Sequence, residues 1–154
     1  MNGPRRSEDV GFLLDVLDLR PGMSVLVIDR GTVSGAVTGQ VGPRGRVCVA
    51  SDPARAHEQF GRHGPFDRIC AVRVPDLLAD PAPVAALAPL LAEAGQLWVL
   101  AEAGPADGTG TVSMTVSTLL AQAGYAIVDI LERGSLVAVW AAGSRVTHGA
   151  ASLR

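Results

Sequence analysis

The sequence predicts an α/β fold built on a Rossmann-like, open and mostly parallel sheet of about six strands. Short apolar runs rich in β-branched residues alternate with helical or turn-rich segments, as in parallel sheets that are covered on both faces. The last two apolar runs follow each other across a tight connection, which predicts a C-terminal antiparallel hairpin. The length of 154 residues, 48% of them hydrophobic, suits one domain with a sizeable core.

The first half of the chain alternates helices and strands. We expect a helix over residues 7–19, strands over 24–29 and 46–51, and a short helix over 36–41. Ser7 is the expected N-cap of the first helix, in which apolar residues recur at helical spacing. The run at 24–29 is uninterrupted and apolar, as expected for a strand buried on both faces. Residues 53–65 are polar and are expected to form a loop.

The second half continues this alternation and ends in the hairpin. We expect strands over 66–72, 96–101, 125–131 and 135–141, a helix over 81–95, and a helix that opens at Thr111 or Ser113. Pro89 is expected to bend or divide the helix over 81–95, and Gly95 to end it. Gly124 fits the C-terminal cap of the later helix. Residues 102–110 are expected to form a flexible loop.

Composition and charge limit the functions open to this chain. Residues 1–142 are expected to form a single domain and residues 143–154 a polar, flexible tail. The formal net charge of −2 argues against a nucleic-acid partner, and no apolar run is long enough to span a membrane. All 13 basic residues are arginine, which excludes a Schiff-base or P-loop lysine. Cys48 and Cys70 lie in apolar runs, which predicts reduced, buried thiols and a cytoplasmic location.

Several stretches, taken in order, are similar to one large enzyme family. They are Leu19–Thr32, around the first strand; Val41–Pro53, with an acidic residue after the second; Phe66–Val72; Leu90–Leu100; and Leu119–Tyr125. With the closing hairpin they cover most of residues 13–142 and resemble the class I S-adenosylmethionine-dependent methyltransferases. The resemblance implies a methyltransferase-like fold and S-adenosylmethionine as the cofactor.

The resemblance also implies a cofactor site at the carboxyl ends of the strands, where strand order reverses. The implied cofactor-binding residues are Asp29, Gly31, Ser51, Asp52, Val72 and Arg73. Gly31 belongs to the turn that brings backbone close to the ligand, and Asp52 would accept both ribose hydroxyls. Residues 71–73 would lie near the methionine part. Asp52 alternatively caps a turn before Pro53, because Asp-Pro often begins a turn.

The sequence departs from the family pattern around the first strand. Val27 stands where the family has an acidic residue, and Asp29 and Val33 stand where it has glycines. If the family's turn is kept, Val33 is a steric outlier that costs on the order of 1–3 kcal/mol. Asp29 adds a carboxylate at a close approach, or pairs with the ligand's ammonium group. Residues 53–65 are too few for the family's helix and further strand, so we expect one edge strand, and the adenine-binding acid that follows it, to be missing.

The remaining candidates have structural explanations as good as their catalytic ones. Asp67 is expected to make a structural hydrogen bond at the entry of the third strand. His57 and His63 have no third ligand at convincing spacing, so no metal site is predicted. Arg73 and Asp76 follow the third strand and are candidates for acid–base or substrate-anchoring roles, or for a surface ion pair. No catalytic residue is assigned.

Three functions are compatible with this pattern. The first is a methyltransferase that acts on a small-molecule acceptor. The second is a cofactor-free, methyltransferase-like module that forms a homodimer or binds another protein through an exposed edge strand at Arg46–Ser51. The third is a non-methylating biosynthetic enzyme, such as a cyclase or isomerase, on the same fold. The first is favoured because Asp52 and the turn after the first strand keep part of the family pattern.

Overall fold

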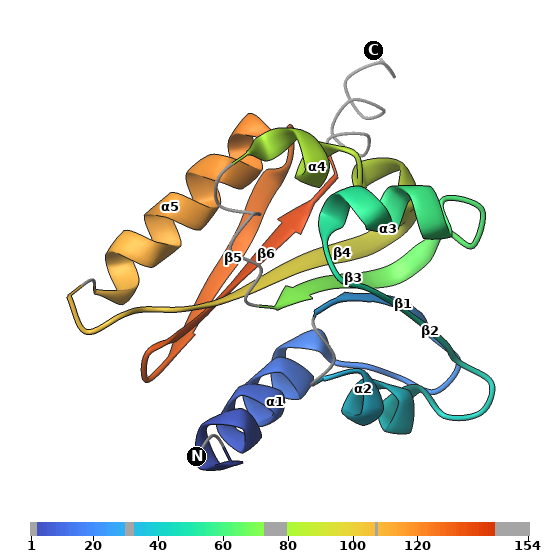
Figure 1. Cartoon of the computed structure of the whole chain (residues 1–154), viewed down its shortest axis with the longest axis horizontal. Coiled ribbons are helices and arrows are strands. Elements are labelled where there is room, and N and C mark those ends of the chain that lie inside the picture. The colour runs from blue at the N-terminus through green and yellow to red at the C-terminus, as the bar shows by residue number, and fades with distance from the viewer. Residues whose placement is uncertain (1–2, 30–32, 73–79, 107, 144–154) are drawn as a thin grey trace.

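The computed structural model describes residues 3–29, 33–72, 80–106 and 108–143 (Figure 1). Its strands are β1 (Ser24–Ile28), β2 (Arg46–Ala50), β3 (Phe66–Val72), β4 (Leu91–Glu102), β5 (Ala126–Arg133) and β6 (Leu136–Ala142). Its helices are α1 (Gly3–Leu17), α2 (Ser34–Val41), α3 (Pro53–Phe60), α4 (Pro81–Ala85) and α5 (Thr109–Gln122), with a 3₁₀ turn, η2, at Ala88–Leu90. The strands form one sheet in the order β2-β1-β3-β4-β6-β5.

The sheet confirms the predicted fold class. The strands β2, β1, β3 and β4 run parallel, and β6 is antiparallel to both β4 and β5. The hairpin between β5 and β6 turns at Gly134, whose φ of 61° suits a residue without a Cβ. α5 ends before Gly124, as predicted, and Tyr125 N donates to Leu120 O at 3.0 Å in a Schellman-type cap.

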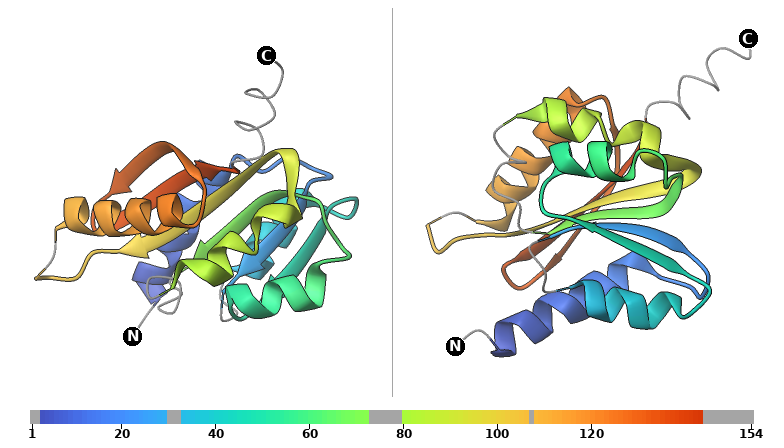
Figure 2. Two further views of the ribbon diagram at one scale, coloured as in Figure 1. Left: turned by 90° about the horizontal axis from the view of Figure 1, so that it is seen from above. Right: turned by 45° about the vertical axis from the view of Figure 1, so that its right-hand side comes forward.

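Helices cover both faces of the sheet, as the views in Figures 1 and 2 show. α1 and α2 pack on one face, and α3, α4 and α5 pack on the other. The core on the first face includes Leu13, Val27 and Val37, and the core on the second includes Leu26, Val84 and Leu120. β1 is therefore buried on both faces, which explains its uninterrupted apolar sequence.

The segment after β2 is a helix, not the polar loop that the sequence predicts. Asp52 Oδ1 accepts a hydrogen bond from Arg55 N at 2.8 Å and caps α3, and Pro53 occupies the first turn. Pro53 and Ala56 are the buried residues of this helix, and Ala56 is fully buried. Between β2 and β3 the chain has this one helix and no strand, so β2 is a terminal strand. The predicted loss of an edge strand is confirmed.

The connection between β3 and β4 differs from the prediction at its end. The helix divides near Pro89 as expected, but β4 already begins at Leu91, so Gly95 lies inside the strand. β4 bulges there, and its register against β3 shifts between Phe66 and Arg68. A Cβ on Gly95 would lie 2.9 Å from Phe66 O, so glycine allows this close approach of two backbones.

The start of α1 is a third correction. α1 begins at Gly3, so Ser7 lies inside the helix and is not its N-cap. A proline in the first turn, here Pro4, favours this earlier start. Residues 144–154, which make up nearly all of the predicted tail, lie outside the described residues. Among the helices of the described part, none is long and apolar enough to cross a membrane.

Candidate functional site

The carboxyl ends of β1, β2 and β3 form the topological switch point of the sheet. From β1 the chain crosses one face through α2 to β2, and from there it crosses the other face through α3 to β3. The three ends are level, because Ile28 pairs with Ala50 on one side and with Ala71 on the other. Ligands of open α/β sheets bind outside the carboxyl ends of strands at such a point.

Asp29 directly follows β1 and is buried, with 7% of its surface exposed. Its Oδ2 accepts a hydrogen bond from Val33 N at 3.0 Å, and its backbone N–H donates to Ala50 O at 3.0 Å. The carboxylate thus ties the turn to the start of α2, while the backbone extends the contact with β2. Burial, with a smaller contribution from the Asp29 charge, raises the pKa of the Cys70 thiol on β3 to about 12.

Val33 does not adopt the strained conformation that the family's turn would impose on it. Its φ of −109° and ψ of −24° are those of an ordinary right-handed residue, and it precedes α2 as the N-cap. Its side chain is 2% exposed and belongs to the core formed with α1 and α2. The side chain therefore packs on the face of the sheet that α1 and α2 cover, and it does not extend past the strand ends. Val33 is therefore not strained, and its N–H is held by the carboxylate of Asp29.

Ser51 and Asp52 follow β2 and are more accessible. Ser51 is exposed, and the Asp52 side chain is 31% exposed. Besides the capping bond to Arg55 N, Asp52 Oδ2 lies 3.7 Å from Arg55 Nε. The capping alternative for Asp52 is thus realised, and it leaves the carboxylate partly open to solvent at the switch point.

The other implied cofactor residues divide into two groups. Val72 ends β3 and is 4% exposed, and its side chain packs in the core beside α1, so only its backbone faces the switch point. Gly31 and Arg73 lie outside the described residues, as does the candidate Asp76. The described part of the site therefore consists of two carboxylates, an exposed serine and the backbone at the end of β3.

Of the residues considered for other roles, Asp67 and His63 make structural contacts. Asp67 Oδ2 accepts a hydrogen bond from Ser24 N at 2.9 Å, which confirms the predicted strand-entry contact. His57 is exposed on α3, and the exposed His63 packs edge-on against Phe60 with ring centroids 5.6 Å apart. Cys70 is fully buried as predicted, whereas Cys48 on the terminal strand β2 is only half-buried.

An acidic side chain at the end of a fourth strand is not among the residues that the sequence predicts for the site. Glu102 is the last residue of β4, two positions beyond the residue paired with Val72. It is exposed, and its Oε2 lies 3.3 Å from Ser135 Oγ at the turn into β6. The signal was available, because Glu102 follows an apolar run just as Asp52 does.

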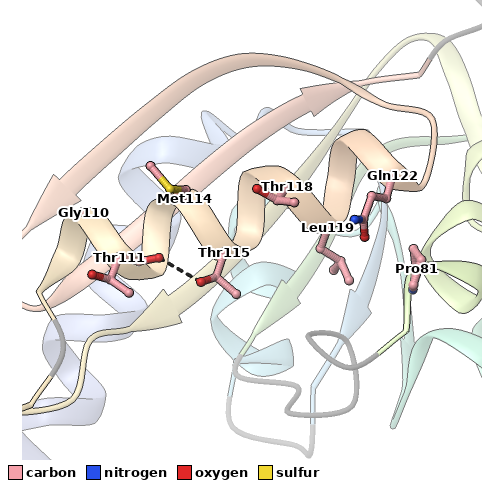
Figure 3. A pocket seen from close by; sticks show the side chains of 8 residues that line it. All are labelled: Pro81, Gly110, Thr111, Met114, Thr115, Thr118, Leu119 and Gln122. Atoms are coloured by element: carbon pink, nitrogen blue, oxygen red, sulfur yellow. Dashed lines mark hydrogen bonds between the residues drawn. The ribbon is translucent and has the colours of Figure 1, made fainter.

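The sequence prediction also does not include a cavity of about 670 Å³ along α5, which is open to solvent (Figure 3). Its described lining consists of Pro81, Gly110, Thr111, Met114, Thr115, Thr118, Leu119 and Gln122. None of these residues is charged, and the volume lies within the range of about 300–1,000 Å³ typical of small-molecule sites. Thr115 Oγ1 donates to Thr111 O at 2.9 Å. The threonines at positions 111, 115 and 118 share a helical spacing, which is the signal that the sequence offered.

Comparison with known proteins finds similarity at the level of structure. No protein-family model and no curated protein matches this sequence. Fibrillarin from Aeropyrum pernix, crystallised with natively bound S-adenosyl-L-methionine, aligns with a TM-score of 0.62 and 19% identity over 88% of this chain and 74% of its own. Precorrin-6y C5,15-methyltransferase from Geobacter metallireducens aligns with a TM-score of 0.60 and 16% identity, over 88% and 87% of the two chains.

A third structure extends this comparison to a protein substrate. The release-factor-specific protein-(glutamine-N5) methyltransferase from Alicyclobacillus acidocaldarius aligns with a TM-score of 0.52 and 19% identity, over 89% of this chain and 92% of its own. At these identities the similarity establishes the fold. The chain has the fold of class I S-adenosylmethionine-dependent methyltransferases, as its sequence resemblance implies. The named acceptors differ too widely to indicate one for this chain.

Proposed function

We propose that this chain binds S-adenosylmethionine where β1, β2 and β3 end, and that it transfers the methyl group to a small, uncharged acceptor. The observation that carries the proposal is the reversal of strand order at β1, flanked by the carboxylates of Asp29 and Asp52. The Geobacter and Alicyclobacillus proteins are methyltransferases, and the Aeropyrum fibrillarin holds S-adenosylmethionine. This supports the same ligand at the same place in the fold.

The two carboxylates suit the two ends of the ligand. Asp52 is partly exposed, and a carboxylate accepts two hydrogen bonds, which a pair of ribose hydroxyls supplies. Asp29 places a negative charge in a buried position at the end of β1, where the charge attracts an ammonium group more strongly than it would in water. When bound, S-adenosylmethionine supplies the electrophilic methyl group. The chain's own part is to orient the two reactants, which requires few dedicated catalytic side chains.

The cavity along α5 supports a small, uncharged acceptor. Threonine hydroxyls and the Gln122 amide line it together with Met114 and Leu119, and the described lining carries no charge (Figure 3). Such a mixture suits a molecule with an apolar body and a few hydrogen-bonding groups. The Thr109 end of α5 lies at the carboxyl side of the sheet, because it follows β4 after a short loop.

Cofactor binding is tested by calorimetric titration with S-adenosylmethionine and with its demethylated product. We expect saturable binding, which Asp52→Ala weakens roughly 10- to 100-fold through the loss of hydrogen bonds to a charged acceptor. The matched control is Asp80→Ala. Asp80 also precedes a proline and caps a helix, through Ala82 N at 3.0 Å, but it caps α4 and not a strand end of the switch point. Absence of binding by the wild-type chain to either ligand would remove the proposal.

The acceptor class is tested by methyl transfer from radiolabelled S-adenosylmethionine to a panel of neutral small molecules. Thr118→Trp fills the cavity, so we expect it to lower transfer while cofactor affinity stays unchanged. Ala121→Trp is the control, because Ala121 is exposed on the same helix and does not line the cavity. Equal losses in both variants would contradict a role for the cavity.

A cofactor-free binding module is the second candidate function. It is favoured by the Asp29 carboxylate, which already accepts a hydrogen bond within its own turn. The terminal strand β2 would then be the partner-binding edge, and its Val49 is 38% exposed. This candidate predicts no cofactor binding and an association that Val47→Pro abolishes, because proline removes a donor from the strand and distorts it. Cofactor binding together with an association unaffected by Val47→Pro would contradict it.

A further inference from the structure

The other terminal strand, β5, exposes more apolar surface than β2. Val128 is 47% exposed, Ile130 38% and Leu131 36%. Seven of the eight residues of β5 are exposed, and Ile127 is half-buried. The inner edge of the strand pairs with β6. Apolar side chains beside unpaired backbone groups form a template for another strand.

The charges on β5 carry both signs. Asp129 and Arg133 stand four positions apart and face the same side of the sheet, since they pair with Trp140 and Leu136 of β6. Charged residues normally protect an edge strand from pairing. Two opposite charges at an even spacing can instead complement each other when the strand meets an antiparallel copy of itself.

We propose that two copies of this chain associate through β5, antiparallel and with Leu131 on the two-fold axis. The two sheets then form one continuous sheet. In this register Leu131 lies opposite Leu131 of the second copy, Ile130 opposite Glu132, and Asp129 opposite Arg133, so the charge pair occurs twice by symmetry. The inference goes beyond the proposed function and does not depend on it.

Neighbouring two-fold registers are less favourable. Directly opposed residues of two antiparallel strands point to the same face of the sheet. A two-fold axis normal to the sheet must therefore place one residue opposite its own copy. Centring on Asp129 or on Glu132 places two like charges directly opposite each other. Centring on Ile130 places Asp129 opposite Leu131. Only the register centred on Leu131 pairs opposite charges across this strand and stacks an exposed apolar side chain on its own copy.

In the single chain, Arg133 and Asp129 both have local partners. Arg133 lies 2.9 Å from Asp15 of α1 and 4.9 Å from the centroid of the Phe12 ring, which orients its guanidinium group. Asp129 Oδ1 accepts a hydrogen bond from Ile130 N at 2.8 Å. On pairing, the backbone of the second copy would replace this local bond, and the carboxylate would turn to Arg133 of that copy. A guanidinium group has enough donors for both carboxylates.

The register is tested by cysteine cross-linking in a Cys48→Ser background, in which the buried Cys70 is the remaining native thiol. Opposed residues have Cβ atoms about 5 Å apart, within reach of a disulfide. We expect Leu131→Cys to give a disulfide-linked dimer under mild oxidation. Ile130→Cys is the matched control on the same strand, and it should stay monomeric because Ile130 lies opposite Glu132. Cross-linking of Ile130→Cys but not of Leu131→Cys would overturn the register.

The association itself is tested by sedimentation velocity over a range of concentrations. We expect the wild-type chain to dimerise and Leu131→Lys to remain monomeric, because two ammonium groups would meet on the axis. Circular dichroism checks that this exposed position tolerates lysine without unfolding. Val47→Pro, on β2, should leave the dimer intact. A monomeric wild-type chain at every concentration, or a dimer lost in Val47→Pro and kept in Leu131→Lys, would overturn the proposal.

Discussion

The neighbouring strands β1 and β2 are each followed by an aspartate, but the two carboxylates differ in exposure and in hydrogen-bond partners. Asp29 is 7% exposed and accepts from Val33 N within its own turn. The Asp52 side chain is 31% exposed and caps α3 through Arg55 N. A buried carboxylate must be satisfied by fixed partners, whereas a partly exposed one can exchange its partners with solvent or with a ligand.

The comparison shows which departure from the family pattern is structural. At β1, where Asp29 and Val33 stand in place of glycines, Asp29 supplies a hydrogen-bond acceptor, and Val33 supplies the donor and a core side chain. At β2 the acidic residue retained from the pattern has a local capping role that leaves it accessible. We therefore expect changes at β1 to act mainly on stability and changes at β2 to act mainly on ligand binding.

The largest effect is expected from Asp29→Ala. Removing the Asp29 carboxylate leaves the Val33 N–H without its buried acceptor, which lowers the free energy of unfolding by about 2–3 kcal/mol. Urea denaturation followed by circular dichroism measures this change. A loss no greater than that of Asp52→Ala would contradict the difference between the two strand ends.

Val33→Gly is expected to lower the free energy of unfolding by about 2 kcal/mol, because a buried valine side chain is lost. The sign of this effect is informative. If valine were strained at a positive φ, glycine would stabilise the chain, but its φ of −109° gives glycine no such advantage. A rise in the urea midpoint of Val33→Gly would show that valine is strained at this position and would contradict the prediction.

The sequence predicts the architecture better than it predicts this turn. The apolar runs around Val27 and Leu97 fix two-sided burial and hence a parallel sheet, and the short segment after Asp52 fixes the missing strand. These features depend on composition and length alone. The position of Val33 depends on a hydrogen bond with Asp29 that no propensity encodes, so the family pattern predicts a strain that Val33 does not have.

Two predicted element boundaries are wrong for comparable reasons. The pair Asp52-Pro53 was expected to begin a loop, but an acidic cap followed by proline equally begins a helix, and the buried Ala56 decides in favour of the helix. Gly95 was expected to end a helix because the apolar spacing continues to Leu91. The strand begins at Leu91 instead, because this residue pairs with Phe66, a contact between distant parts of the chain.

The buried thiol beside Asp29 predicts a dependence of stability on pH. Burial raises the pKa of Cys70 from an ordinary 9.0 to about 12, so above pH 9.0 the unfolded chain releases this proton while the folded chain keeps it. The free energy of unfolding therefore falls as pH rises, by at most about 1.4 kcal/mol per pH unit from this group, and is unaffected by it below that range. Chemical denaturation between pH 8 and 10, about the ordinary thiol range, measures the slope.

Cys70→Ala should flatten this slope, whatever it does to absolute stability. Cys48→Ala is the control, because Cys48 is half-buried and the nearby Arg46 opposes the rise that burial causes in its pKa. Burial also raises the pKa of Tyr125 above its ordinary 10.0, so the comparison is made below that pH. An unchanged slope in Cys70→Ala would show that the thiol ionises equally easily in the folded chain.

The smallest effect on stability is expected at the end of β2, and it separates capping from ligand binding. Asp52 and Asp80 each precede a proline and accept from a backbone N–H near the start of a helix, at 2.8 and 3.0 Å. Replacing either by alanine should lower the free energy of unfolding by about 1 kcal/mol, the usual cost of a lost N-cap. Because the two losses should be similar in urea denaturation, a drop in cofactor affinity confined to Asp52→Ala is not a consequence of instability. If Asp52→Ala instead costs far more stability than Asp80→Ala, its effect on binding reflects local unfolding of α3, and the direct role of the carboxylate is contradicted.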